Sequence, residues 1–217
     1  MANQVIYGRQ PVAEAERGRR RVHRVWRAPE ADPAELERLC GSPDHQGVVA
    51  EVDPYPYADA RGLLRGEDAL LVALDQVQDP RNLGAVCRSA EFAGADGVVV
   101  PERRSAAVTP ATCKASAGAV EHLQVAHVRN LADWLAEAKA AGFWIWGADA
   151  AARSPAWEVD LKGPTVLVLG GEGQGIRPRV AKACDGLISL PQRGIVESLN
   201  VSAAATALLF EALRQRQ

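Results

Sequence analysis

Residues 165–213 read TVLVLGGEGQGIRPRVAKACDGLISLPQRGIVESLNVSAAATALLFEAL, which contains two apolar segments, a loop after each, and a final apolar segment. Continuous apolar runs predict strands over Val166–Leu169 and Leu187–Leu190, and such runs are typical of strands buried on both faces of a parallel sheet. The loop after the first strand, GGEGQGIRP, places bare glycine backbone around the carboxylate of Glu172. Because the carboxyl ends of parallel strands meet at one sheet edge, the two loops predict one ligand-binding crevice. Two ordinary turns are the alternative, since glycine punctuates most α/β connections.

The second loop, QRGIVESLN, ends in Ser198, Leu199 and Asn200, where a hydroxyl and an amide can open a helix. Neither loop carries a known nucleotide-binding signature. No Lys-Ser/Thr pair follows the glycines, and Ile176 stands where GxGxxG needs its third glycine. We therefore expect a ligand that is not held through a diphosphate.

The composition is that of a soluble protein: 47% of the 217 residues are hydrophobic and 24% are charged. No apolar run approaches the roughly 18 residues of a membrane span, and the N-terminal MANQVIYGRQ lacks the apolar stretch of a signal peptide. Four dispersed cysteines form no CxxC pair, which favours reduced thiols over disulfides or zinc. These features predict a cytoplasmic protein with no membrane partner and no metal.

A formal net charge of −2 means that any affinity for RNA has to come from local patches. One such patch lies near the N-terminus, where no acidic residue stands between Glu16 and Glu30 and each guanidinium suits a phosphate. The predicted RNA-binding residues are Arg17, Arg19, Arg20, Arg21 and Arg24, with His23 and Arg27 among them. A solvated turn between a helix and a strand is the alternative.

The chain divides into two predicted domains. Residues 1–56 predict a small α+β unit, and the Pro- and Tyr-rich residues 57–67 predict a linker. Residues 68–217 alternate strand and helix, which predicts an α/β domain with a six-stranded, mostly parallel sheet and helices on both faces. Its other four strands are expected at Ala69–Leu74, Gly97–Val100, Leu123–Val128 and Phe143–Trp146.

The loop after the first strand of this sheet adds two candidate residues. Asn82 stands where a helix N-cap is expected, and Arg88 follows less than two turns later, so an arginine can lie near the crevice. Capping alone is the alternative for Asn82. For Arg88 the alternative is a surface charge paired with Glu91.

Three segments of the sequence resemble the motifs of a known family. NLGAVCRSAEFAG, LVLGGEGQGIRP and ISLPQRGIVESLNVSAAATALLFEA resemble, in order, the three motifs of the SpoU (TrmH-like) family of RNA 2′-O-methyltransferases. CKASAGAVEHLQVAHV is similar to the branch that methylates a guanosine in large-subunit ribosomal RNA. YGRQPVAEA and HQGVVAEV resemble that branch's ribosomal-protein-like RNA-binding domain, although the span from Trp26 to His45 is shorter than the family pattern.

The resemblance implies a fold, a cofactor and roles for residues. It implies a C-terminal trefoil knot of the SPOUT type, S-adenosylmethionine as cofactor and a homodimer paired through the C-terminal helix and knot region. Arg88 would be the catalytic residue, Asn82 would place the RNA, and Glu172, Ser198 and Asn200 would shape the site. The cofactor would be bound around Gly147, Gly170, Gly173, Leu190 and Leu199.

The implied reaction is an in-line displacement in which a ribose 2′-oxygen attacks a methyl group on sulfonium. A guanidinium group loses its proton only above about pH 12. We therefore expect Arg88 to orient the ribose hydroxyl and to stabilise charge rather than to act as a base. A nicotinamide-dependent oxidoreductase would need GxGxxG after the first strand, and DQVQDPRNLG does not supply it. A tRNA 2′-O-methyltransferase of the same family and a non-catalytic RNA-binding module remain open.

The last helix supports the predicted homodimer independently. Val201–Leu213 reads VSAAATALLFEAL and is apolar nearly all round. One stripe can cover its own sheet, and the rest needs another partner, for which small alanines permit close approach. A helix wholly buried in its own subunit is the alternative.

Overall fold

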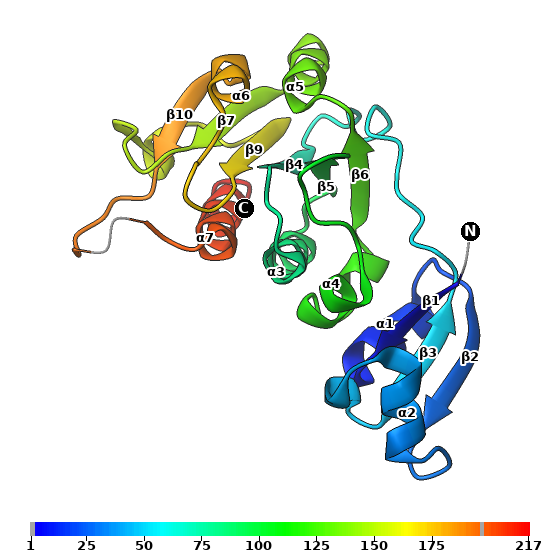
Figure 1. Ribbon diagram of the computed structural model, residues 1–217. Helices are drawn as coiled ribbons and strands as arrows, with labels where there is room; N and C mark the ends of the chain where they lie inside the picture. The colour runs from blue at the N-terminus through cyan, green and yellow to red at the C-terminus, as the bar shows by residue number, and fades with distance from the viewer. Residues whose placement is uncertain (1–2, 196–197) are drawn as a thin grey trace.

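The computed structural model describes residues 3–195 and 198–217, whose strands form two separate sheets (Figure 1). The smaller sheet is antiparallel, in the order β1-β3-β2. Its strands are β1 (Gln4–Tyr7), β2 (Val22–Arg27) and β3 (Val48–Val52), and its helices are α1 (Arg9–Arg17), α2 (Pro33–Cys40) and the 3-10 turn η1 (Pro43–His45). Neighbouring residues of β3 pack on opposite sides, Ala50 in the core with α1 and Val49 with α2, so the sheet is covered on both faces.

The larger sheet is parallel throughout, with the order β6-β5-β4-β9-β7-β10-β8. Its strands are β4 (Leu70–Asp75), β5 (Gly97–Pro101), β6 (Gln124–Val128), β7 (Trp144–Ala148), β8 (Ser154–Pro155), β9 (Thr165–Gly170) and β10 (Gly186–Ser189). Seven strands lie in the described residues, one more than predicted. The additional strand, β8, is two residues long and ends in proline, so it carries no sequence pattern of a strand.

Helices cover both faces of this sheet, as predicted. They are α3 (Pro80–Phe92), α4 (Pro110–Ala115), α5 (Leu131–Ala140), α6 (Pro178–Ala183) and α7 (Val201–Gln215), with 3-10 turns η2 (Ala119–Glu121) and η3 (Ala156–Glu158). Alternate residues of the fully buried β4 explain the two layers: Val72 packs with α3 and α7, whereas Leu71 packs with α5 and α6. Among the described helices, none is both long and apolar enough to cross a membrane.

The N-terminal unit packs against α4 and η2 of the larger domain (Figure 1). Arg20 and Glu121 form an ion pair with side chains 1% and 0% exposed, and the Arg20 guanidinium also donates to Gln4 Oε1 at 2.8 Å. The Tyr55 hydroxyl donates to Val120 O at 2.9 Å, and Lys114 Nζ donates to Asp44 O at 2.9 Å. These contacts fix the small unit on the β6 side of the larger sheet.

All strands of the larger sheet point the same way, so the loops after β4, β9 and β10 leave from one edge. Each of these loops leads into or contains one of the three motifs that resemble the SpoU family, so the three motifs meet at this edge. This edge is where the sequence predicts the crevice. The C-terminal trefoil knot stays a prediction.

Candidate functional site

A buried ion pair fastens the glycine loop to the centre of the sheet. Asp75, the last residue of β4, has a fully buried side chain, and its Oδ1 accepts from Arg177 Nε at 2.8 Å and lies 2.7 Å from Nη2. Asp75 Oδ2 accepts from the Arg177 backbone N at 2.8 Å. Both carboxylate oxygens are therefore satisfied, which a buried charge requires. Arg177 is the N-cap of α6, so this pair sets where the loop after β9 ends.

Close backbone packing folds that loop back on itself. A Cβ on Gly170 would lie 1.9 Å from Gly175 C, and one on Gly171 would lie 2.4 Å from Gln76 O, so neither position has room for a side chain. Gly173 and Gly175 have φ values of +79° and +61° and open space around them. The tip of the loop, at Gly173 and Gly175, is therefore exposed backbone. The base of the loop, at Gly170 and Gly171, packs against other backbone atoms.

Three polar residues from three separate loops join at this edge. Asn82 Nδ2 donates to Glu172 Oε1, and Asn200 Nδ2 donates to Asn82 Oδ1 at 3.1 Å. Asn200 Oδ1 also accepts from the Ser202 backbone N at 2.8 Å and so caps α7. The three side chains form one hydrogen-bonded chain that ends at the Glu172 carboxylate. That carboxylate lies near the N-termini of α3 and α7, where partial positive charge favours an anion.

The predicted N-cap role of Asn82 is wrong. Helix α3 begins at Pro80, and its N-cap is Asp79, whose side chain accepts from the Arg81 backbone N at 2.8 Å. Hydrogen bonds from Arg81 lower the pKa of the Asp79 carboxyl. Proline at the first helical position and aspartate before it outcompete an asparagine two residues later. The Asn82 amide is therefore free to join the other two loops.

Helices α3 and α7 lie side by side from this cluster onward. Ser89 Oγ lies 2.6 Å from Thr206 Oγ1, and the rings of Phe92 and Phe210 stack with centroids 6.0 Å apart. Phe92 is 75% exposed and Phe210 is 41% exposed, so the far end of this seam presents aromatic surface to solvent. The Asn82–Asn200 bond is the first of these three links along the two helices.

Arg88 lies beside this seam with its side chain exposed. It has no hydrogen bond or ion pair with any residue that the structure describes, so the alternative pairing with Glu91 does not occur. Six residues of helix separate it from Asn82, which corresponds to a rise of about 9 Å. Arg88 therefore lies between the polar cluster and the exposed phenylalanine rings. Within a single chain it does not contact the polar cluster.

The other predicted site residues, Ser198 and the remaining cofactor residues, lie around the same edge. Ser198 and Leu199 are exposed just before α7, and Leu190 is half-buried directly after β10. Gly147 is buried, and a Cβ there would lie 2.7 Å from Leu187 Cδ2 and 3.1 Å from Cys184 Sγ. Burial raises the pKa of the Cys184 thiol to about 11, so a neutral thiol lies over Gly147.

The N-terminal arginine cluster is not one continuous surface. Arg20 is 5% exposed and committed to Glu121, so its predicted phosphate contact is corrected to a structural role. Arg19 donates to the carbonyls of Glu121 and Leu123, and Arg17 pairs with Glu14. Exposed guanidinium groups remain at Arg21 and Arg24, and Arg24 lies over the Trp26 ring at 4.8 Å. An open hollow of about 520 Å³ lies here, lined by Glu16, Arg20, Val22, His23, Arg24 and Val25.

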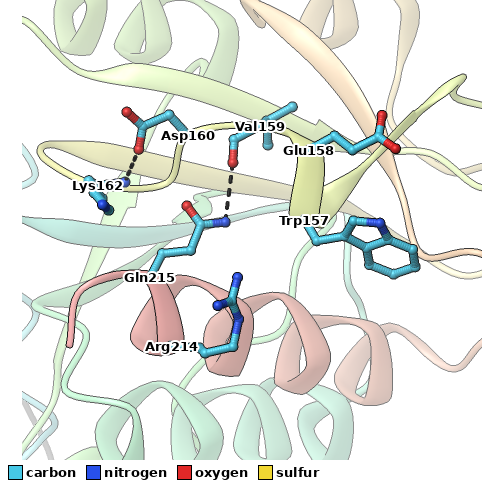
Figure 2. A pocket seen from close by; sticks show the side chains of 7 residues that line it. All are labelled: Trp157, Glu158, Val159, Asp160, Lys162, Arg214 and Gln215. Atoms are coloured by element: carbon cyan, nitrogen blue, oxygen red, sulfur yellow. Dashed lines mark hydrogen bonds between the residues drawn. The ribbon is translucent and has the colours of Figure 1, made fainter.

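A second hollow, of about 400 Å³, lies far along α7 from the polar cluster (Figure 2). Gln215 Nε2 donates to Val159 O at 3.2 Å across its floor, and the Lys162 backbone N donates to Asp160 Oδ1 at 2.9 Å. The lining residues come from η3, the loop before β9 and the end of α7, and they include none of the predicted site residues. We do not assign this hollow to the candidate site.

The sequence reasoning missed Asp75 and Arg177. Both lay inside segments that it singled out, at the end of a predicted strand and in GGEGQGIRP. An aspartate at the carboxyl end of a strand buried on both faces was the available signal, because a carboxylate there has to be paired.

Two family models match the chain. Residues 69–210 match the model of the "SpoU rRNA Methylase family", and residues 27–58 match that of "RNA 2′-O ribose methyltransferase substrate binding". The first match contains every member of the polar cluster and Arg88.

Curated relatives are similar over most of the chain. A Bacillus subtilis protein assigned to the TrmH family of tRNA/rRNA methyltransferases is 45% identical over 177 residues, which are 79% of this chain and 71% of the relative. A Mycolicibacterium smegmatis protein named as an uncharacterized tRNA/rRNA methyltransferase is 45% identical over 194 residues, 87% of this chain. The match covers 62% of that relative's length.

Solved structures are similar over nearly the whole fold. The SpoU methyltransferase AviRb from Streptomyces viridochromogenes, in complex with the cofactor AdoMet, has a TM-score of 0.85 at 28% identity, covering 99% of this chain and 90% of that one. An AdoMet-bound rRNA methyltransferase from Sinorhizobium meliloti has a TM-score of 0.86 at 26% identity, covering 98% and 87%. The likeness thus includes the small N-terminal sheet.

Proposed function

The chain belongs to the SpoU rRNA methylase family, and we propose that it transfers a methyl group from S-adenosylmethionine to a ribose 2′-hydroxyl of RNA. Its relatives are named tRNA/rRNA methyltransferases, and two similar structures hold AdoMet. The single observation that carries the proposal is the hydrogen-bonded chain of Glu172, Asn82 and Asn200. It brings one residue from each resembling motif to the same sheet edge.

The residues at this edge fit the cofactor. Gly173 and Gly175 present open backbone in a left-handed conformation, which suits close approach by a small ligand. Leu199 is 60% exposed on the neighbouring loop and offers apolar surface for an adenine ring. Gly147 is the penultimate residue of β7, Gly170 ends β9, and Leu190 directly follows β10. Together with Gly173 and Leu199, they would hold S-adenosylmethionine between the loops after β7, β9 and β10.

When bound, S-adenosylmethionine supplies a methyl group already activated by the positive sulfonium. The protein then has to align the ribose oxygen and assist the loss of one proton. Asn82 is held at both ends of its amide, so its position is fixed before RNA arrives. We assign Asn82 to placing the ribose, and Glu172, Ser198 and Asn200 to shaping the pocket around it.

Arg88 is the proposed catalytic residue. Its positively charged guanidinium orients the 2′-hydroxyl or an adjacent phosphate and stabilises developing negative charge. The absence of any partner among the described residues leaves its charge available for RNA.

We also propose that the active form is a homodimer. The inner stripe of α7 is buried in its own chain, whereas Ala203, Ala207 and Phe210 are exposed on the other side and continue into Phe92 of α3. Two stacked phenylalanines beside small alanines form an apolar surface suited to a two-fold interface. Arg88 lies at the border of that surface, so it can reach the polar cluster of the partner rather than that of its own chain.

The substrate we propose is a guanosine of large-subunit ribosomal RNA. The match of residues 69–210 to the SpoU rRNA methylase family and the likeness to an rRNA methyltransferase support ribosomal RNA. Methylation of tRNA is the alternative, because the curated relatives are named for both.

Two measurements test this function. Titration calorimetry should give micromolar affinity for S-adenosylmethionine and no binding of NAD, and the opposite result would remove the proposed class. Mapping of 2′-O-methyl marks in ribosomal RNA and in tRNA, with and without the gene for this protein, identifies the substrate. A mark lost only from tRNA would overturn the ribosomal assignment and leave the enzyme class intact.

A further inference from the structure

Three arginines outside the predicted sites lie along the carboxyl edge of the larger sheet. Arg103 and Arg104 follow β5, and Arg129 follows β6. All three are exposed, and none has a hydrogen bond or ion pair with a described residue. Other arginines at this face do have partners: Arg81 pairs with Asp79 and Arg179 with Asp133.

Backbone hydrogen bonds place these arginines in a row that leads to the polar cluster. Glu102 N donates to Val128 O at 2.9 Å, which joins the loop after β5 to the end of β6 beside Arg129. Ala106 N donates to Val77 O at 2.8 Å, which joins the other end of that loop to the segment before Asp79 and α3. The loop carrying Arg103 and Arg104 therefore lies between Arg129 and Asn82.

The strand order gives the length of this row. From β6 through β5 and β4 to β9 there are three strand spacings, or roughly 14 Å. That is the reach of a short single-stranded segment lying across the edge. The linker enters at the β6 end, where Ala58 N donates to Val125 O at 2.9 Å and Tyr57 stacks on His127 at 3.8 Å. The row thus runs from the candidate site toward the side on which the N-terminal unit is packed (Figure 1).

The loop itself has features that are found where a ligand is expected. Arg104 has a φ of +58°, a left-handed conformation that costs a non-glycine residue free energy. The Ser105 hydroxyl is buried without a partner among the described residues. Glu102 is the one acidic residue in the segment between β5 and α4 that carries Arg103 and Arg104, in a protein whose formal net charge is −2.

We propose that Arg103, Arg104 and Arg129 form a phosphate-binding track that holds the RNA strand next to the methylated nucleotide. The inference rests on the proposed function, because it takes RNA to be the substrate. Guanidinium groups suit phosphate, and contacts to phosphate position a strand without reading its sequence. The track sets the direction in which RNA leaves the site, from Asn82 across β5 to β6.

The test compares two sets of substitutions that remove exposed cations from opposite edges of the same sheet. The track variant is Arg103→Gln, Arg104→Asn and Arg129→Gln, in which asparagine tolerates the left-handed backbone. The control variant is Arg65→Ala and Lys162→Ala, which are exposed at the amino edge, before β4 and β9. Unchanged thermal midpoints would show that both variants fold, and the single charge reversal Arg129→Glu gives a second reading if the triple change does not.

Binding is measured by fluorescence anisotropy with a fluorescein-labelled single-stranded RNA oligonucleotide over a range of KCl concentrations. We expect the track variant to lose affinity for RNA by about tenfold or more. The slope of the logarithm of the binding constant against the logarithm of the KCl concentration should become less steep by about 2, since each phosphate contact contributes about 0.7. In methyl transfer, KM for RNA should rise by the same factor, with kcat and S-adenosylmethionine affinity unchanged. A track variant with the affinity and slope of the control variant would overturn the track. A wild type that binds RNA but never methylates it would overturn the proposed function instead.

Discussion

Arg88 is an exposed positive charge on α3 without an ion-pair partner among the described residues. We predict that Arg88→Ala keeps the fold and S-adenosylmethionine binding but lowers kcat for methyl transfer by about 100-fold or more, because a partner of the charge in the transition state is lost. Stopped assays with radiolabelled methyl donor and saturating RNA measure this change.

Arg88→Lys is the informative companion, because it keeps the charge and loses the planar fork of donors. Arg65→Ala, at the opposite edge of the sheet, is the matched control for removing an exposed arginine. Near-normal turnover of Arg88→Ala would exclude the catalytic role.

Single residues of the site could be predicted from the sequence only where local patterns marked them. Glu172 lies shortly after one apolar strand and Asn200 ends the loop that follows another, so their place at the sheet edge was predictable. The role of Asn82 as a bridge was not, because it depends on bonds to residues 90 and 118 positions away. Arg20 was misassigned for the same reason: its partner Glu121 belongs to the other domain.

At the scale of elements, the glycine loop after β9 separates two kinds of glycine. Gly170→Ala should disrupt the loop and lower stability, because its Cβ would overlap the Gly175 backbone. In Gly173→Ala the new methyl group enters open space, so the cost in free energy is only that of the left-handed backbone, about 1 kcal/mol. We predict that Gly173→Ala folds normally and weakens S-adenosylmethionine binding before it weakens RNA binding, as calorimetry and anisotropy can measure. Weaker RNA binding with intact cofactor affinity would place the ligand elsewhere.

The junction between the two domains depends on the Arg20–Glu121 pair. Glu121→Ala leaves a buried guanidinium without its carboxylate and should lower the free energy of unfolding by about 3–5 kcal/mol, as urea denaturation can measure. The double change Arg20→Met with Glu121→Leu should recover most of this loss, because it removes both charges.

Arg17→Ala is the surface control, since that side chain is 73% exposed and its pair with Glu14 should contribute only about 0–1 kcal/mol. A loss from Glu121→Ala no greater than that of the control would mean that the pair is not what holds the domains together.

Helices and strands were predictable where their apolar residues followed a regular period or where a capping residue marked a helix end. The parallel sheet and its helices follow from apolar runs alternating with helical stripes. Strands β1 and β8 were missed, because four and two residues are too few to show a period, and pairing with β3 and β10 creates them. The packing of the small unit on α4 and η2 could not be read from either segment alone, since it rests on contacts about 100 residues apart in the sequence.

For the whole molecule, the proposed dimer predicts where a charge disrupts assembly. Phe210→Glu should halve the mass in solution, measured by light scattering, while the chain stays folded, because Phe210 is exposed in the single chain. Leu209→Glu is the contrasting variant. Leu209 is 0% exposed within its own subunit, so a charge there should unfold the chain instead. A wild type that is monomeric and fully active would exclude the dimer.

Mixing variants tests whether the site draws on two chains. Arg88→Ala and Glu172→Ala, each inactive alone, should together recover about a quarter of wild-type activity, since half of the dimers are mixed and each then has one intact site. An intact dimer with no recovery would place Arg88 in the site of its own chain.

The bond between Asn82 and Asn200 also bears on the order of events during synthesis. Asn82 leaves the ribosome long before Asn200 and α7, and a growing chain folds from its N-terminal side. Until α7 docks on α3, Glu172 and Asn82 have no third partner and the pocket lacks one wall. Under the proposed function, a nascent chain therefore carries the small N-terminal unit long before it can modify RNA, and catalytic competence arrives only with the last helix.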